Sequence, residues 1–205
     1  TRLDARQRQV EQRRARGQLV DDQRQRQHAP PRLGHLAAHL GDDGQAAGLP
    51  GDKMDWIIEK AVEMGVSRFV PIRAQRSVLQ LNAERQAKRM GHWQRVIESA
   101  SEQCGRNRLM ELSAPLTLAE YFREAETGLH LFCDPDAPQQ LAQAIGPQDQ
   151  AMTILIGPEG GWSPEEQKVA LDAQAQAIRF GHRVLRTETA ALALTAAISA
   201  LQGWE

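Results

Sequence analysis

Three glycines, a proline and an acid follow directly after an aliphatic run in ILIGPEGGW, residues 154–162. A strand that ends in such a loop can bring main-chain N–H and C=O groups close to a ligand, because glycine has no side chain. The loop lacks the lysine of a phosphate loop, and its glycines are not spaced as GxGxxG. The pattern favours a ligand held by backbone groups, such as an adenosine with a compact polar tail. The alternative is a plain tight turn from strand to helix.

A second segment, FGHRVLRTETA at residues 180–190, follows another strand-like run, AIRFG. In open α/β sheets, ligands bind beyond the carboxyl ends of the strands, where the loops gather. The two segments are therefore expected to form two walls of one pocket.

Elements that could position these loops are readable from residue 51 onward. Helices are predicted at residues 54–62, 82–104 and 139–145, after Thr117, after Ser163, and from Thr187 to Gly203. Thr117 with Glu120, and Ser163 with Glu166, have the spacing of capping boxes. Strands are predicted in VSRFVPIRA, GLHLFCD, AMTILIG and AIRFG. This alternation predicts an α/β fold with a parallel sheet and helices on its faces.

Residues 1–50 have a different composition. Arg and Gln supply 17 of the 50 residues, and the segment contains no Ile, Met, Phe, Trp or Tyr. So little apolar material cannot offset the entropy of ordering. We therefore expect residues 1–50 to be disordered or a frayed helix, and the folded domain to comprise residues 51–205. The formal net charge of −1 predicts no general attraction to nucleic acid, and any basic surface must be local.

Four stretches in this order, MDWIIEKAVEMGV, SEQCGRNR, ILIGPEGGWSPEE and FGHRVLRTETAAL, resemble the bacterial 16S ribosomal RNA uracil-N3 methyltransferases of the SPOUT class. The resemblance runs from about Gly51 to the C-terminus. It implies a trefoil-knotted α/β domain, S-adenosylmethionine as cofactor, and a homodimer formed through the knot and the terminal helix. It further implies 16S ribosomal RNA or the 30S subunit as substrate, a cytoplasmic location, and neither a metal nor a membrane.

The resemblance also implies the site residues. The cofactor pocket falls on the end of LFCD and on Leu155, Ile156, Gly157, Glu159, Gly160, Gly161, Phe180, Gly181, Val184, Leu185, Arg186 and Thr189. RNA contact falls on Gln103, Arg106, Asn107 and Arg108, which follow a helix with a basic polar face.

The chemistry that the resemblance implies assigns roles to three residues. Loss of the uracil N3 proton leaves negative charge on the neighbouring carbonyl oxygens, which an arginine would stabilise: Arg186 first, Arg106 second. Glu188 is the candidate base, or alternatively an acid that stabilises the first turn of a helix. Glu159 is either a ligand contact or an acid that satisfies N–H groups of its own loop.

The family normally begins with a small RNA-binding β-barrel, which residues 1–50 do not resemble. A translated wrong reading frame or a degenerate domain would each explain this. Without the barrel, the chain could be a remnant that binds the cofactor without methylating RNA. Two further alternatives are a SPOUT ribose 2′-O-methyltransferase and an unrelated flavodoxin-like nucleotide binder.

Overall fold

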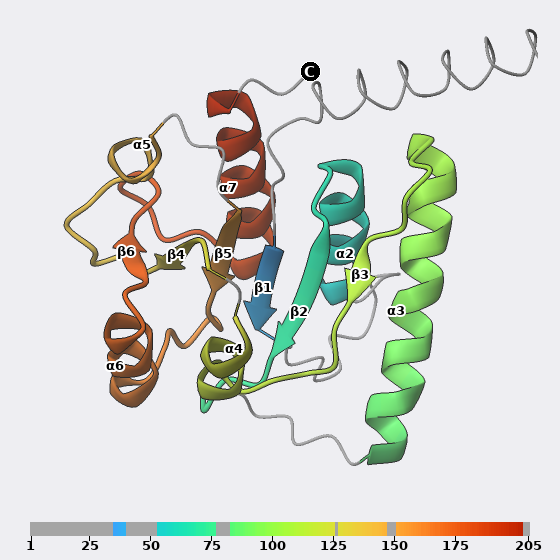
Figure 1. Ribbon diagram of the computed structural model, residues 1–205, viewed down its shortest axis with the longest axis horizontal. Helices are drawn as coiled ribbons and strands as arrows, with labels where there is room; N and C mark the ends of the chain where they lie inside the picture. Colours follow the sequence, from blue (N-terminus) through green and yellow to red (C-terminus); the bar gives the residue numbers. More distant parts are fainter. Residues whose placement is uncertain (1–34, 40–52, 77–82, 126, 147–150, 203–205) are drawn as a thin grey trace, which may run out of the picture. The chain divides into compact units, whose positions relative to one another are not determined.

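The computed structural model describes residues 35–39, 53–76, 83–125, 127–146 and 151–202. Six parallel strands form one sheet in the order β3-β2-β1-β5-β4-β6 (Figure 1). The strands are β1 (His35–His39), β2 (Arg68–Ile72), β3 (Glu111–Leu112), β4 (Leu129–Cys133), β5 (Met152–Ile156) and β6 (Gln176–Ile178). The helices are α2 (Lys53–Glu63), α3 (Ala83–Cys104), α4 (Leu118–Glu124), α5 (Leu141–Ala144), α6 (Pro164–Asp172) and α7 (Thr187–Leu201). The predicted α/β class with a parallel sheet is confirmed.

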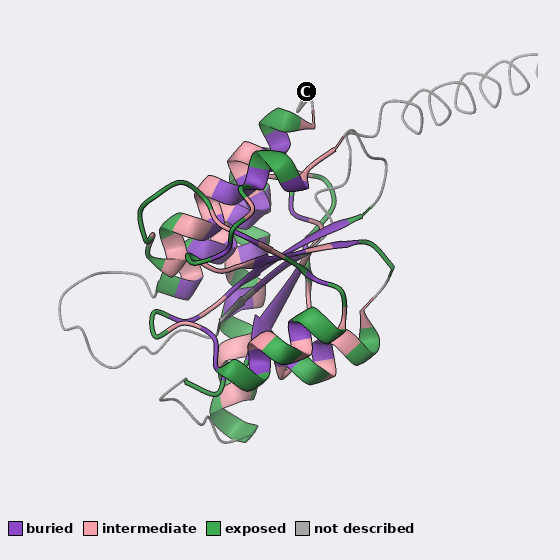
Figure 2. Cartoon of the chain, turned by 90° about the vertical axis from the view of Figure 1, so that its left-hand side faces the viewer, coloured by how far each residue is buried: buried purple, intermediate pink, exposed green. Residues whose placement is uncertain are grey.

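Successive strand residues point to opposite faces of the sheet and so build two apolar cores. On β5, Ile154 belongs to the core beneath α2, α3 and α7, whereas Leu155 belongs to the core beneath α4 and α6. In Figure 2 the buried strands lie between helices whose outward surfaces are exposed. Helices on both faces leave the carboxyl ends of the strands as the place where loops can gather.

Local sequence signals set several helix boundaries as predicted. The side chain of Ser163 accepts a hydrogen bond from the N–H of Glu166, and the Glu166 carboxylate accepts one from the N–H of Ser163. Thr117 and Glu120 form the same reciprocal pair before α4. Both predicted capping boxes are confirmed. They could be predicted because each depends on residues only three positions apart.

Two strands lie where no strand was predicted. Residues 35–39 form β1, which pairs with β2 on one side and β5 on the other, so this part of residues 1–50 belongs to the sheet. The rest of residues 1–50 lies outside the described residues. β3 has only two residues, too few for a pattern. The trefoil knot stays a prediction. No helix in the described part of the chain is both long and apolar enough to span a membrane.

Candidate functional site

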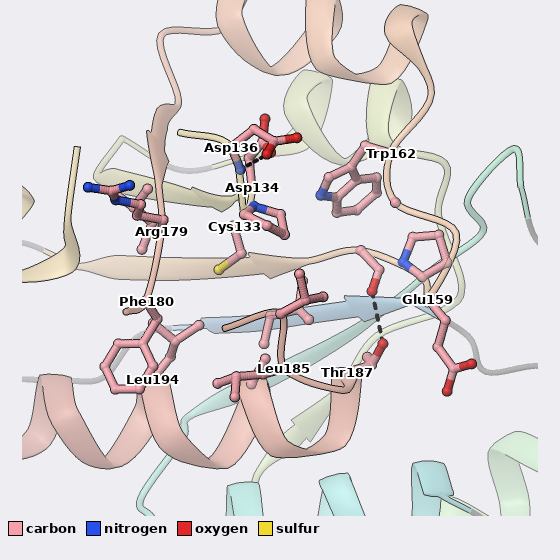
Figure 3. Close-up of a pocket in the computed structure, with 18 of the residues that line it drawn as sticks. Cys133, Asp134, Asp136, Glu159, Trp162, Arg179, Phe180, Leu185, Thr187 and Leu194 are labelled. Atoms are coloured by element: carbon pink, nitrogen blue, oxygen red, sulfur yellow. Dashed lines mark hydrogen bonds between the residues drawn. The ribbon is translucent and has the colours of Figure 1, made fainter. Parts of the chain in front are cut away.

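A cavity of about 500 Å³ lies at the carboxyl ends of β4, β5 and β6 (Figure 3). Its walls come from residues 133–136 after β4, residues 156–162 after β5 and residues 178–185 after β6, with the start of α7 as a further side. The volume is in the range of small-molecule sites. The prediction that the glycine loop and the segment from Phe180 face one pocket is confirmed.

Position 157 requires a glycine because the indole of Trp162 leaves no room for a side chain there. A Cβ atom at position 157 would lie 2.8 Å from Cε2 and Nε1 of the indole. That ring cannot easily move, since it is 4% exposed and stacks on Phe132 with a centroid separation of 5.1 Å. Gly161, with φ of 69°, closes the turn by donating its N–H to Pro158 O at 2.8 Å. The glycine loop is thus a tight turn and a cavity wall at once.

Two side chains from other elements bind this loop, and a third bond ties the start of α6, which follows the loop, to the segment after β2. Arg76 Nη1 donates to Gly160 O at 2.7 Å, and Lys53 Nζ donates to Glu159 Oε1 at 2.6 Å. The buried carboxylate of Glu166 accepts from the N–H of Gln75 at 2.9 Å. The loop after β5 is therefore connected to α2 and to the segment after β2.

The opposite wall is largely apolar. Phe180 and Leu185 lie on the same side of the cavity as Leu194 of α7 (Figure 3), and Val184, which also lines the cavity, is 79% exposed. Thr187 Oγ1 donates to Gly157 O at 3.1 Å, which joins the two predicted segments directly. Gly181 has a φ of 75°, a left-handed conformation that favours glycine.

The wall after β4 carries acids and a thiol. Asp134 Oδ1 accepts from the N–H of Asp136 at 3.0 Å, and both aspartates line the cavity. Burial raises the pKa of the Cys133 thiol to about 12, which favours the protonated thiol at neutral pH. The described residues contain no group of three or more His, Cys, Asp or Glu placed to hold a metal ion.

Most of the predicted cofactor residues line the cavity. They are Ile156, Gly157, Glu159, Gly160, Gly161, Phe180, Gly181, Val184 and Leu185. The side chain of Glu159 nevertheless points away from the cavity (Figure 3) towards Lys53, whose ammonium lowers the pKa of that carboxyl.

Three predicted cofactor residues do not line the cavity. Leu155 is buried in the core beneath α4 and α6, because it points to the opposite face of β5 from Ile154 and Ile156. Arg186 is the exposed N-cap residue of α7, and Thr189 is exposed in the first turn. Glu188, also in that turn, has a buried Oε2 without a hydrogen-bond partner among the described residues.

The residues predicted to contact RNA lie elsewhere. Gln103 belongs to the last turn of α3, and Arg106, Asn107 and Arg108 follow it on the way to the start of β3. Since parallel strands all begin at one edge of the sheet, this group lies at the edge opposite the cavity. Arg106 Nη1 donates to Val62 O at 3.2 Å, and burial lowers the pKa of its guanidinium. Within one chain Arg106 therefore supports the end of α2.

Sequence reasoning did not single out Arg76, Asp136, Gln167 or Arg179, which also line the cavity. The rule that loops gather at carboxyl ends of strands could have indicated Asp136, shortly after LFCD. Arg76 and Gln167 have no local signal, because only the tertiary fold brings them to the glycine loop.

Comparisons with known proteins agree with this geometry. A family model described as RNA methyltransferase domain matches residues 46–199. The ribosomal RNA small subunit methyltransferase E of Bacillus subtilis is 31% identical over 163 residues, which cover 75% of this chain and 64% of that protein. The chain thus spans less than two thirds of that relative's length.

Two solved structures have similar folds. A protein from Legionella pneumophila, in complex with the cofactor S-adenosylmethionine, is 33% identical with a TM-score of 0.76. A ribosomal RNA small subunit methyltransferase E from Neisseria gonorrhoeae, bound to S-adenosylmethionine, is 32% identical with a TM-score of 0.73. Each match covers 83% of this chain and 67% of the other. Because the family model covers well over half of the sequence, the chain belongs to the family of RNA methyltransferase domains.

Proposed function

We propose that the chain binds S-adenosylmethionine in the cavity and methylates N3 of a uracil in 16S ribosomal RNA. The observation that carries the proposal is the 500 Å³ cavity, walled by the two segments Gly157–Gly161 and Phe180–Leu185. The two similar structures that contain S-adenosylmethionine support the choice of cofactor, and the curated relative supports the choice of RNA.

The residues of the cavity fit this cofactor chemically. The tight turn at Gly157 leaves main-chain groups at the cavity wall, and the buried Trp162 Nε1 has no hydrogen-bond partner among the described residues. Phe180, Val184 and Leu185 offer an apolar surface for an adenine ring. Asp134 and Asp136 place negative charge beside a ligand that carries a cationic sulfonium and an ammonium group. When bound, the cofactor would supply the methyl group.

The first turn of α7 would serve the acceptor base. Glu188, whose buried Oε2 has no hydrogen-bond partner among the described residues, stays the candidate to take a proton from uracil N3. The guanidinium of Arg186, at the positive end of the α7 dipole, would stabilise the negative charge that remains on the base. Arg106 stays the second candidate for this role, and Thr189 and Leu155 stay predictions as cofactor residues.

Two copies are proposed to associate through α2 and α7. Trp56 of α2 is 37% exposed, and it lies close to Ala191 and Leu192 of α7. An exposed aromatic residue beside an apolar helix is typical of protein interfaces. The proposed ribosomal substrate places the reaction in the cytoplasm.

Calorimetry with S-adenosylmethionine and a tritiated-methyl assay on 30S subunits that lack the modification test the proposal. We expect both binding and transfer, with nucleoside mass spectrometry identifying N3-methyluridine. Binding without transfer would identify a cofactor-binding remnant, and a 2′-O-methylated product would identify a ribose methyltransferase. Absence of binding at millimolar cofactor would overturn both methyltransferase assignments.

A further inference from the structure

The N-terminal half of α3 extends beyond the part of the helix that packs on the sheet (Figure 1). None of the residues from Ala83 to His92 is buried, and the first buried residue is Trp93. A helix of 22 residues is about 33 Å long, whereas the five residues of β2 span about 17 Å. Because α3 follows the carboxyl end of β2, its projecting half lies at the same edge of the sheet as the cavity.

The projecting half carries a basic stripe, which we define as Arg85, Lys88, Arg89, His92 and Arg95. Their spacing of i, i+3, i+4, i+7 and i+10 places them within an arc of roughly 120° on the helix. Glu84 is the one acid between Ala83 and Arg95, while Glu98 and Glu102 lie in the second half.

This charge order opposes the helix dipole, which favours acids in the first turns and cations in the last. The last turn of α3 contains no basic residue. The helix dipole therefore does not explain the stripe. For Lys88 and Arg95 no ion pair among the described residues offsets this unfavourable placement, and a feature that breaks a local rule without a structural gain points to function.

A hydrogen bond and an ion pair connect the stripe to the cavity. His92 Nε2 lies 2.6 Å from Asp55 Oδ2 in the first turn of α2. Two residues earlier in the same turn, Lys53 Nζ lies 2.6 Å from Oε1 of Glu159, in the glycine loop. A single turn of α2 thus separates the stripe from the cavity wall.

We infer that the basic stripe binds the phosphates of the RNA whose base enters the cavity, an inference that rests on the proposed function. Lys88 and Arg95 are exposed and form no ion pair among the described residues, so their charges are available to a polyanion. A membrane surface fits less well, because the apolar residues Trp93 and Ile97 of α3 are buried in the core and leave no apolar face to insert.

The test compares two double variants of the full chain that remove the same charges. Lys88→Gln with Arg95→Gln removes one lysine and one arginine from the stripe. Arg123→Gln with Lys168→Gln removes one of each from exposed sites on α4 and α6, on the other face of the sheet. Binding of a short fluorescein-labelled RNA containing uracil is measured by anisotropy over a series of salt concentrations.

We expect the stripe variant to lower the slope of log affinity against log salt by about 1 to 2, and to weaken binding ~10-fold at moderate salt, equally for different RNA sequences. The control variant should leave both unchanged. Both variants should bind S-adenosylmethionine like the unaltered chain, which also verifies that they are folded.

Equal losses in the two variants, or no loss in the stripe variant while the unaltered chain methylates 30S subunits, would overturn the inference and leave the proposed function intact. An unaltered chain that binds S-adenosylmethionine but neither binds RNA nor transfers a methyl group would overturn both.

Discussion

Gly157 is the cavity residue at which an added side-chain atom should disturb the structure most. An added Cβ would lie 2.8 Å from the indole of Trp162, which is buried and stacked on Phe132. Gly157→Ala should therefore displace the ring or the loop. We expect a loss of about 1–3 kcal/mol in the free energy of unfolding and at least ~10-fold weaker binding of S-adenosylmethionine, measured by urea titration and calorimetry.

Gly160→Ala provides the matched control for this prediction. A Cβ at position 160 would approach only the side chain of Arg76, at 3.9 Å, an ordinary contact. Its backbone is not in the left-handed region, so alanine should be tolerated. Equal effects of the two substitutions would show that the indole contact does not determine the requirement for glycine.

Glu159 is expected to contribute little to cofactor binding, although it belongs to the cavity loop. Its carboxylate is paired with Lys53, and the two side chains are 65% and 51% exposed. Exposed ion pairs contribute little because water and salt screen them. Glu159→Gln should weaken S-adenosylmethionine binding by less than about fivefold, and the effect should shrink in high salt. A salt-independent loss far above this in calorimetry would mean that the carboxylate contacts the ligand.

Residue types and positions in the loops were readable from the sequence, but side-chain directions were not. Leu155 and Ile156 are adjacent aliphatic residues, and only the pleat of β5 decides that Ile156 alone reaches the cavity. Likewise, Glu159 turns outward because Lys53, more than a hundred residues earlier, lies beside it.

The start of α4 depends on one carboxylate, and this makes its stability depend on pH. Hydrogen bonds from the N–H and hydroxyl of Thr117, together with Arg73, lower the pKa of Glu120 to about 2 from a usual value near 4.5. Since the folded pKa lies below the unfolded one, the contribution is complete above about pH 4.5 and is lost as the pH falls towards 2.

Comparison of the unaltered chain with Glu120→Gln measures this contribution. The difference in the free energy of unfolding should be constant from pH 7 to about 5 and should decrease as the pH falls further, as followed by urea denaturation. Glu124→Gln is the control, because Glu124 is exposed and forms no hydrogen bond or ion pair within the described residues. A difference for Glu120→Gln that does not change with pH would contradict the assignment.

Helix starts were predictable because their signals are local, whereas β1 was not. A capping box needs residues three positions apart, so Ser163 and Glu166 could be recognised without the fold. The strand HLAAH has only one leucine and two alanines between its histidines, too weak an apolar run to predict a strand. It forms because its backbone pairs with β2 on one side and with β5 on the other, and this position buries Leu36 and Ala37.

The sheet as a whole depends on β1, because among the described strands it alone lies between β2 and β5. The family model begins at residue 46 and thus excludes it. A chain trimmed to residues 46–205 would lose the hydrogen bonds that join the β2 side of the sheet, with α3, to the β5 side, with the cavity. We therefore expect this chain to show no cooperative unfolding transition in urea and no binding of S-adenosylmethionine.

A substitution in the full chain separates loss of the strand from loss of chain length. Ala37 is fully buried between β2 and β5, so Ala37→Asp would place an unpaired carboxylate inside the apolar core beneath α4 and α6. It should abolish the cooperative transition as the trimmed chain does, whereas Ala37→Ser should retain it with reduced stability. If circular dichroism and urea titration showed the trimmed chain to be as stable as the full one, another segment would have to fill the gap, and the sheet order would not be what holds the cavity together.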